Sequence, residues 1–181
     1  MPHITVPADI PGIRALLAFR PETAGPLGAL ANALLHAPNS LSPGDRELIA
    51  AYVSSLNSCT FCWRSHAAIA ACHFDSESLV DAAVANPEAA PLTPKMKALL
   101  ALAARVQQSG RAVTAADIER ARDEGATDVE IHDTVLIAAA FCMFNRYVDG
   151  LGALTPTDPE AYRARAAQTA REGYVPPAPP A

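Results

Sequence analysis

Apolar residues recur every three or four positions along most of this chain, and no stretch alternates convincingly between apolar and polar residues. The first spacing places side chains on one face of a helix, whereas alternation is typical of a half-buried strand. Many apolar segments also begin with a helix-capping pair, such as Ser42 before Pro43 or Thr93 before Pro94. The pattern therefore predicts an all-α protein.

Caps and breaks divide the chain into short helices and three regions. Residues 1–20 are expected to form an N-terminal arm, 21–155 a single helical domain, and 156–181 a C-terminal helix with a proline-rich tail at 176–180. The predicted helices cover residues 13–19, 21–35, 43–56, 59–72, 76–84, 94–109, 131–148 and 159–172, and one further helix starts at Thr114 and stops at Gly125. Thr114 with Asp117, and Thr127 with Glu130, resemble capping boxes, and the second box begins the long apolar helix at 131–148.

Composition and charge narrow the possible functions. The chain has 181 residues, which is enough for one domain with a substantial core, and its longest uncharged run is too short to span a bilayer. A formal net charge of −5 without basic clusters argues against nucleic acid. No basic and apolar leader opens the chain, so we expect a cytoplasmic protein without a membrane partner. Its low charge and abundant Ala and Leu favour apolar surface shared between subunits.

Candidate chemistry is concentrated in one stretch, residues 58–66. On a helix, Cys59 and Cys62 lie one turn apart, and His66 lies one turn beyond Cys62, so all three project from one face. Two thiols at this spacing can close a disulfide. A histidine beside a thiol can take its proton or stabilise its thiolate. The stretch therefore predicts a compact dithiol redox site.

Glu47 can join this site only if the chain turns between it and the cysteines. An unbroken helix would set Glu47 and Cys59 about 18 Å apart. Asn57 and Ser58 are good cap residues, and we predict a break there that folds the two helices side by side. The break also puts Cys59 at a helix start, which favours its thiolate, whereas proximity to His66 favours that of Cys62. The pattern leaves open which thiol is more acidic.

Two other interpretations of the cysteines remain. A structural zinc site would use Cys59, Cys62 and His66 with a fourth ligand such as His73, although zinc ligands usually come from two separate loops or turns. The cysteines could also be plain core residues that behave as small hydrophobes. With four cysteines at uneven spacings, a secreted disulfide scaffold is not indicated.

The register of Glu47, Cys59, Cys62 and His66 resembles the AhpD-like alkylhydroperoxidase signature of the carboxymuconolactone decarboxylase family. Residues 144–152, Phe-Asn-Arg-Tyr-Val-Asp-Gly-Leu-Gly, are similar to a segment of that family's peroxidase-related branch. The resemblance implies an AhpD-like helical bundle over roughly residues 20–155, assembled as a homo-oligomer, a trimer or a hexamer. It also implies a thiol peroxidase, with peroxiredoxin-type activity, that reduces small hydroperoxides and is recycled by a thiol or lipoyl-type reductant.

The resemblance also assigns roles to residues. Cys62 would attack the peroxide and Cys59 would then close a redox-active disulfide with it, with no metal or other cofactor. His66 would relay the proton and Glu47 would orient His66. AhpD members carry a second histidine between the two cysteines, where this chain has Phe61, so the fuller relay of those proteins is not expected here.

Four residues are expected at the substrate pocket, namely Phe61, Trp63, Asn145 and Asp149. Two alternative functions stand beside the peroxidase. The family's other branch decarboxylates a lactone acid without such a cysteine pair, so the two cysteines argue against that activity. The second alternative is a non-catalytic, redox-sensing or zinc-stabilised helical module.

Overall fold

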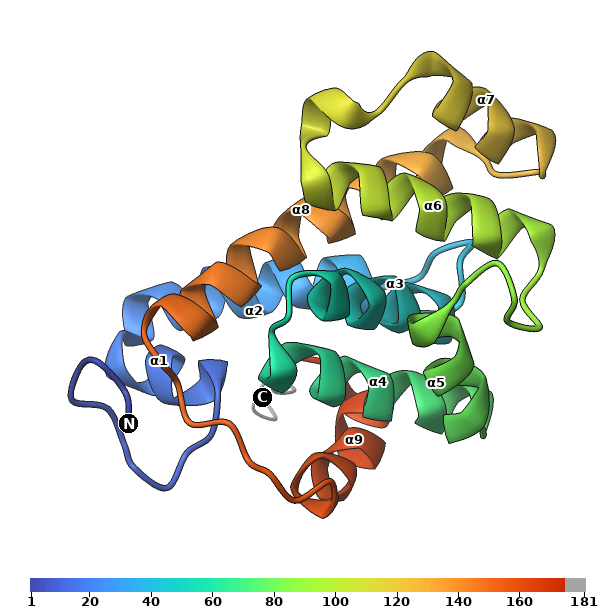
Figure 1. Ribbon diagram of the computed structural model, residues 1–181. Coiled ribbons are helices and arrows are strands. Elements are labelled where there is room, and N and C mark those ends of the chain that lie inside the picture. Colours follow the sequence, from blue (N-terminus) through green and yellow to red (C-terminus); the bar gives the residue numbers. More distant parts are fainter. Residues whose placement is uncertain (175–181) are drawn as a thin grey trace, which may run out of the picture.

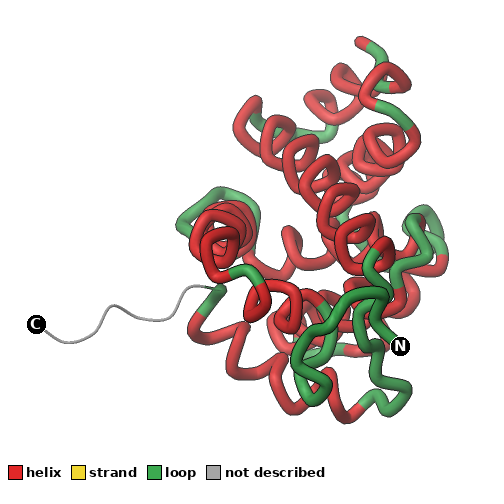
Figure 2. The backbone as a smooth tube through the Cα atoms, turned by 90° about the vertical axis from the view of Figure 1, so that its left-hand side faces the viewer, coloured by secondary structure: helices red, strands yellow, loops and turns green. Residues whose placement is uncertain are grey.

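The computed structural model describes residues 1–174, which form helices joined by loops and contain no strand (Figures 1 and 2). The helices are α1 (Ile13–Phe19), α2 (Pro21–Leu35), α3 (Pro43–Leu56), α4 (Thr60–Phe74), α5 (Glu77–Ala85), α6 (Pro94–Gln108), α7 (Ala115–Asp123), α8 (Asp128–Gly150) and α9 (Glu160–Glu172), with a 3-10 helix at Gly110–Ala112. The all-α prediction is confirmed. The predicted proline-rich tail at 176–180 lies outside the described residues. Across residues 1–174, every helix is too short or too polar to cross a membrane.

Capping boxes set where three of these helices begin. Ser42, Thr114 and Thr127 each accept a hydrogen bond from the amide three residues further on, and the carboxylate at that position bonds back to the cap. Replacing such a cap typically costs about 1 kcal/mol of stability. The capping box at Thr127 starts α8 at Asp128, so the helix has three residues before the apolar run predicted at 131–148.

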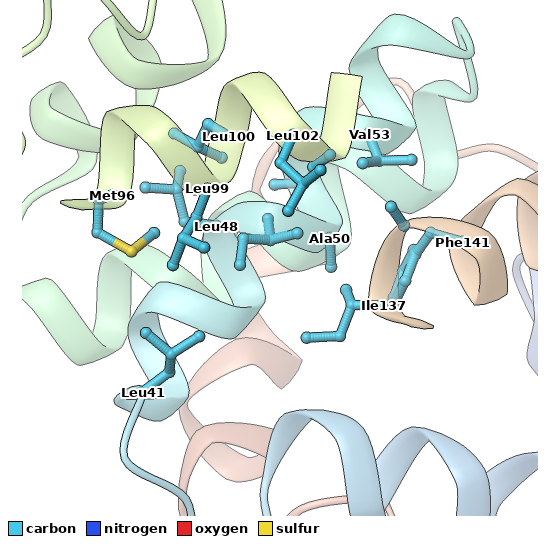
Figure 3. Packing of buried hydrophobic residues seen from close by; sticks show 14 of the residues in the cluster. Leu41, Leu48, Ala50, Val53, Met96, Leu99, Leu100, Leu102, Ile137 and Phe141 are labelled. Atoms are coloured by element: carbon cyan, nitrogen blue, oxygen red, sulfur yellow. The ribbon is translucent and has the colours of Figure 1, made fainter. Parts of the chain in front are cut away.

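Helix α3 lies in the middle of the molecule, with α4 and α5 on one side and α6 and α7 on the other (Figure 1). Figure 3 shows Leu48 and Val53 of α3 packed among Leu99 of α6 and Ile137 and Phe141 of α8. These side chains are almost completely buried. Fully burying one such side chain contributes about 1.5–3 kcal/mol. The core therefore fixes α3 firmly between its neighbours.

The turn between α3 and α4 reverses the chain in three residues. Asn57 caps the end of α3, and Ser58 adopts the left-handed conformation with a φ of 60°. The amide of Cys59 donates to the carbonyl of Ser54 at 3.0 Å. Helix α4 then runs beside α3 (Figure 1). The predicted break is confirmed, but α4 begins at Thr60, so Cys59 precedes the helix and Cys62 is its third residue.

Helices α1 and α9, the first and last in the described residues, pack against the same side of the bundle. The amide of Gly12 donates to the carbonyl of Leu154 at 2.9 Å, which joins the N-terminal segment to the loop after α8. The region expected as an arm contains α1, whose Leu16 is fully buried. Helix α9 packs along α4. Gly12 has a φ of 61°, and the ring of Phe61 fills the space that a side chain there would need.

Candidate active site

Glu47 and His66 meet because α3 and α4 lie side by side. Nδ1 of His66 is 2.6 Å from Oε2 of Glu47, although the residues are nineteen positions apart in the sequence. The Glu47 side chain is 3% exposed and that of His66 is 13% exposed, so the pair is screened from bulk water. A buried carboxylate needs such a partner to remain charged. With Nδ1 committed to Glu47, Nε2 is the ring nitrogen left for chemistry.

Tyr174 completes this pair from the far end of the chain. Its hydroxyl donates to Oε1 of Glu47 at 2.5 Å and lies 3.3 Å from Nδ1 of His66. Burial and the neighbouring Glu47 raise the pKa of Tyr174 well above its ordinary value, so the phenol keeps its proton. Phe141 contacts the imidazole edge-on, with 4.6 Å between ring centroids. Both oxygens of Glu47 therefore have a donor, and the His66 ring is held on two sides.

The position of Tyr174 depends on the turn that follows α9. Its amide donates to the Oδ1 atom of Asn32 on α2 at 3.0 Å. Gly173 has a φ of 74°, and a side chain at this position would stand 2.4 Å from that same Oδ1 atom. The sequence pattern does not predict Tyr174 at this site. A glycine after the helix signals only that α9 ends, and nothing local indicates that the next residue reaches Glu47, 127 positions away.

The two cysteines are free thiols in different environments. Cys59 is fully buried and Cys62 is 4% exposed. A hydrogen bond with Cys62 and burial raise the pKa of Cys59. The pKa of Cys62 is lowered by the hydrogen bond from Cys59, and by the charge of His66 and the amide of Asn145, against the opposing effect of burial. Cys62 is therefore the more acidic thiol.

The positions of the two thiols relative to the start of α4 explain why the helix stabilises the thiolate of Cys62 and not that of Cys59. Cys59 lies just outside the helix, whereas Cys62 lies in its first turn, where the helix dipole stabilises a negative charge. Among the described residues no hydrogen bond joins the imidazole of His66 to the sulfur of Cys62. His66 therefore acts on this thiol through its charge.

A chain of amide hydrogen bonds ties the α3–α4 turn to α6 and α8. Nδ2 of Asn145 donates to Oγ of Ser54 at 3.0 Å, and Nδ2 of Asn57 donates to Oδ1 of Asn145 at 2.8 Å. Gln107 donates in turn to Oδ1 of Asn57 at 2.9 Å. These bonds hold the turn, and with it Cys62, against α8. Asn145 thus lies behind the thiol rather than in front of it.

A cavity of about 290 Å³, here called the Cys62 cavity, opens onto the site. The side chains of Cys62, His66 and Tyr174 line it, but Cys59 does not. Five apolar side chains from four helices provide much of its surface, namely Leu17, Leu27, Ile69, Phe141 and Phe144. A small apolar molecule in this cavity would therefore meet the Cys62 sulfur and the imidazole but not the second thiol.

The four residues predicted at the substrate pocket have different positions. Phe61 lines the Cys62 cavity, and its ring packs against Tyr162 at 5.9 Å between centroids. Trp63 instead lines a second hollow between α4, α5 and α9, because adjacent helical residues point about 100° apart. Asn145 is buried behind Cys62. Asp149 is exposed, and its side chain raises the pKa of Cys59.

The other two cysteines lie outside this site, and the residues proposed as zinc ligands do not form a metal-binding group. Cys72 is exposed and Cys142 is half-buried, and neither lines the Cys62 cavity. Within residues 1–174, no three His, Cys, Asp or Glu side chains are arranged to hold a metal ion. The zinc hypothesis therefore finds no ligand set in the described part of the chain.

Comparison with known proteins identifies relatives of this fold. A sequence model of the carboxymuconolactone decarboxylase family matches the chain twice, over residues 21–104 and 77–156. The matches together run from α2 to just beyond α8, and so include both cysteines, His66 and Glu47. No curated protein matches the sequence.

Two crystal structures are similar over most of the chain. One is described as the alkylhydroperoxidase AhpD core of an uncharacterized peroxidase-related protein from Ralstonia eutropha JMP134, with a TM-score of 0.78 and 27% identity over 87% of this chain and 82% of that chain. The other is an uncharacterized peroxidase-related protein from Silicibacter sp. TM1040, with the same TM-score and identity over 87% of this chain and 81% of that chain.

Proposed function

Because the chain belongs to the carboxymuconolactone decarboxylase family, in its AhpD-like, peroxidase-related branch, we propose that it is a thiol peroxidase that reduces small organic hydroperoxides. One observation carries the proposal. The thiol with the lowered pKa, Cys62, faces an apolar cavity that it shares with His66, while its neighbour Cys59 is buried behind it. This is the arrangement that attack on a peroxide followed by disulfide closure requires.

The first step consumes the peroxide. The Cys62 thiolate attacks the terminal oxygen of the hydroperoxide, a sulfur–oxygen bond forms, and the oxygen–oxygen bond breaks. The leaving alkoxide takes a proton from Nε2 of the His66 imidazolium and departs as the alcohol. Cys62 is then a sulfenic acid. Sulfur has lost two electrons, and the peroxide has gained them.

The second step uses Cys59. The Cys59 thiol loses its proton as its sulfur attacks the sulfur of the sulfenic acid, the sulfur–oxygen bond breaks, and the departing hydroxide takes that proton and leaves as water as the Cys59–Cys62 disulfide forms. An external dithiol of the lipoyl type then reduces the disulfide and returns both thiols. No other cofactor takes part in this cycle. A cysteine pair of this kind is typical of a reducing, cytoplasmic setting.

Glu47 and Tyr174 are positioning residues in this cycle. Glu47 holds Nδ1 of His66 and stabilises the imidazolium that supplies the proton. Tyr174 donates to the other oxygen of Glu47 and so fixes the carboxylate. This chain has Phe61 where AhpD members carry a second histidine, and Tyr174 supplies instead a third residue that holds the Glu47–His66 pair in place.

A coupled peroxidase assay tests the proposal. With cumene hydroperoxide as oxidant and dihydrolipoamide as reductant, the wild-type protein is expected to turn over and Cys62→Ser to lose all turnover. Cys72→Ser is the matched control, because that thiol is exposed and lies outside the Cys62 cavity. Equal rates for wild type and Cys62→Ser would contradict the proposal.

A decarboxylase of the family's other branch would not need either sulfur. The discriminating protein is therefore the double variant Cys59→Ser/Cys62→Ser, assayed with a lactone acid. Activity that survives in this variant would support decarboxylation and count against the peroxidase.

A further inference from the structure

We propose that the Cys62 cavity recognises a carboxylate through Arg14 and Arg165, so that the preferred hydroperoxide is an organic anion with a small apolar body. The peroxide part of this inference rests on the proposed function. The anion site stands on its own observations. These observations are the charges around the cavity, the lack of a protein partner for either arginine among the described residues, and the position of both arginines relative to Cys62.

Apart from the Cys62 sulfur when it is a thiolate, the charged side chains that line the cavity are cationic. Arg14 of α1 and Arg165 of α9 both line it, and no carboxylate among residues 1–174 does. The remaining polar side chains that line it, such as Ser65 and Thr169, are neutral apart from His66. The whole chain has a formal net charge of −5, so the charge of this cavity is opposite in sign to that of the whole molecule. A cationic cavity in an acidic protein favours anionic ligands.

Neither arginine has a protein partner in the described part of the chain. Arg163, two positions earlier on α9, pairs with Glu77 at 2.7 Å, whereas Arg14 and Arg165 make no ion pair or side-chain hydrogen bond with any of residues 1–174. Burial and the nearby charge of Arg165 lower the pKa of Arg14. Two neighbouring guanidinium groups repel each other, and a bound anion between them would relieve that repulsion.

The positions of the groups define the shape of the ligand. The arginines mark the more exposed part of the cavity, since Arg165 is exposed and Arg14 half-buried, while Cys62 is 4% exposed. Apolar side chains such as Leu17 and Phe144 line the same cavity. A guanidinium donates two parallel hydrogen bonds to a carboxylate. A volume of about 290 Å³ is at the lower end for small-molecule sites, which suits a body such as one substituted aromatic ring.

Both arginines come from segments outside the family match. The family model covers residues 21–156, whereas Arg14 precedes and Arg165 follows that range. The cysteines and the Glu47–His66 pair lie within it. The geometry therefore separates reaction chemistry, located in the shared core, from recognition of the acid group, located in the terminal helices α1 and α9.

A binding experiment without redox chemistry tests the anion site. The probe is para-isopropylbenzoate, titrated by calorimetry into the reduced protein, with the neutral para-isopropylbenzamide as reference. Charged hydrogen bonds are strong enough that Arg14→Gln and Arg165→Gln should each weaken benzoate binding by about 10-fold or more. Arg171→Gln, which removes the same charge from α9 outside the cavity, should leave it unchanged. Equal affinity for benzoate and benzamide would overturn the inference.

A kinetic comparison connects the site to catalysis. The substrates are cumene hydroperoxide bearing a para-carboxylate and the methyl ester of the same compound. Wild type should show a higher kcat/KM for the acid than for the ester, and Arg14→Gln and Arg165→Gln should lower that acid-to-ester ratio toward one, with folding of the variants checked separately by circular dichroism. Turnover of both compounds at equal kcat/KM would overturn the anion site and leave the peroxidase standing. Arginine-dependent benzoate binding without any peroxide turnover would instead overturn the peroxidase and leave the anion site standing.

Discussion

Each oxygen of the Glu47 carboxylate has its own donor, His66 on one side and Tyr174 on the other. This arrangement leaves the carboxylate no freedom to rotate and keeps Nδ1 of the imidazole occupied. The Cys62 thiol in turn has a lowered pKa because of Cys59, His66 and Asn145. The reactivity of one sulfur therefore depends on side chains from α3, α4, α8 and the segment after α9.

Replacing His66 should change how the reaction of Cys62 depends on pH. Without the imidazolium the pKa of Cys62 rises, so less thiolate is present near neutral pH, and a shift of one unit reduces it about tenfold. In His66→Ala the rate with an alkylating probe should fall by about 10-fold or more near pH 7 and recover largely near pH 9. The measurement is the pH–rate profile, with His73→Ala as control on the same helix. If the pH–rate profiles of His66→Ala and the parent superimpose, His66 is a packing residue and has no effect on the pKa of Cys62.

Tyr174→Phe isolates the hydroxyl that reaches Glu47. The ring stays, but Oε1 of Glu47 loses its donor, so the imidazole is held less firmly. We expect the peroxide rate near neutral pH to fall several-fold, with a smaller change than in Glu47→Gln, and stability to fall by about 1 kcal/mol. Stopped-flow peroxide consumption and thermal unfolding measure the two effects. A stability loss without any change in the pH–rate profile would assign Tyr174 a structural role alone.

Local spacing identified some of these residues and could not identify others. The cysteines and His66 are neighbours on one helix, and Glu47 follows from a break that cap residues signal. Tyr174, Arg14 and Arg165 reach the site only through the packing of chain ends on the bundle. Such contacts between distant segments leave no periodic pattern in a single sequence.

At the scale of elements, the α3–α4 turn decides whether Glu47 and His66 can meet. Ser58 is exposed and has a φ of 60°, which side-chain-bearing residues adopt at a cost of about 1–2 kcal/mol. The hydrogen bonds of Asn57 to Asn145 and Gln107 hold the turn in spite of that strain.

Two substitutions at Ser58 test the turn without filling the core. Ser58→Gly should keep or raise stability, by up to about 1 kcal/mol, because glycine adopts a positive φ freely. Ser58→Val should lower stability by more than 1 kcal/mol or so, because a β-branched residue resists that conformation. Chemical denaturation measures both. A valine variant as stable as the glycine variant would show that the turn is not strained.

Helix boundaries were predictable where caps exist, and packing partners were not. The boxes at Thr114 and Thr127 and the Pro-initiated helices α3 and α6 are local features, and they were predicted correctly. Helix α9 lies along α4 and helps to enclose the Cys62 cavity. This packing depends on contacts between distant segments, which the sequence pattern does not predict.

At the scale of the whole molecule, α8 leaves an apolar stripe uncovered. Val129, Leu136 and Met143 are 59%, 38% and 44% exposed, and they recur every seventh residue on one face of the helix. A regular stripe of this kind is typical of a surface that packs against another helix. It supports our proposal that the protein is a homo-oligomer, a trimer or a hexamer.

The oligomer proposal makes a quantitative prediction. Sedimentation at micromolar concentration should give a mass that is a multiple of the 18.9 kDa chain, three or six. Leu136→Glu combined with Met143→Glu should shift the protein toward the single-chain mass, because each buried charge without a partner costs several kcal/mol. A monomer for the wild type, or an assembly unaffected by both substitutions, would contradict this use of α8.

The most direct test of the dithiol mechanism is to find which sulfurs one equivalent of hydroperoxide oxidises. Reduced protein is mixed with the peroxide, free thiols are alkylated, and peptides are identified by mass spectrometry. We expect a Cys59–Cys62 linkage in the wild type, and in Cys59→Ser a sulfenic acid trapped on Cys62. Oxidation confined to Cys72 or Cys142, or a sulfenic acid on Cys59 in Cys62→Ser at the wild-type rate, would contradict it.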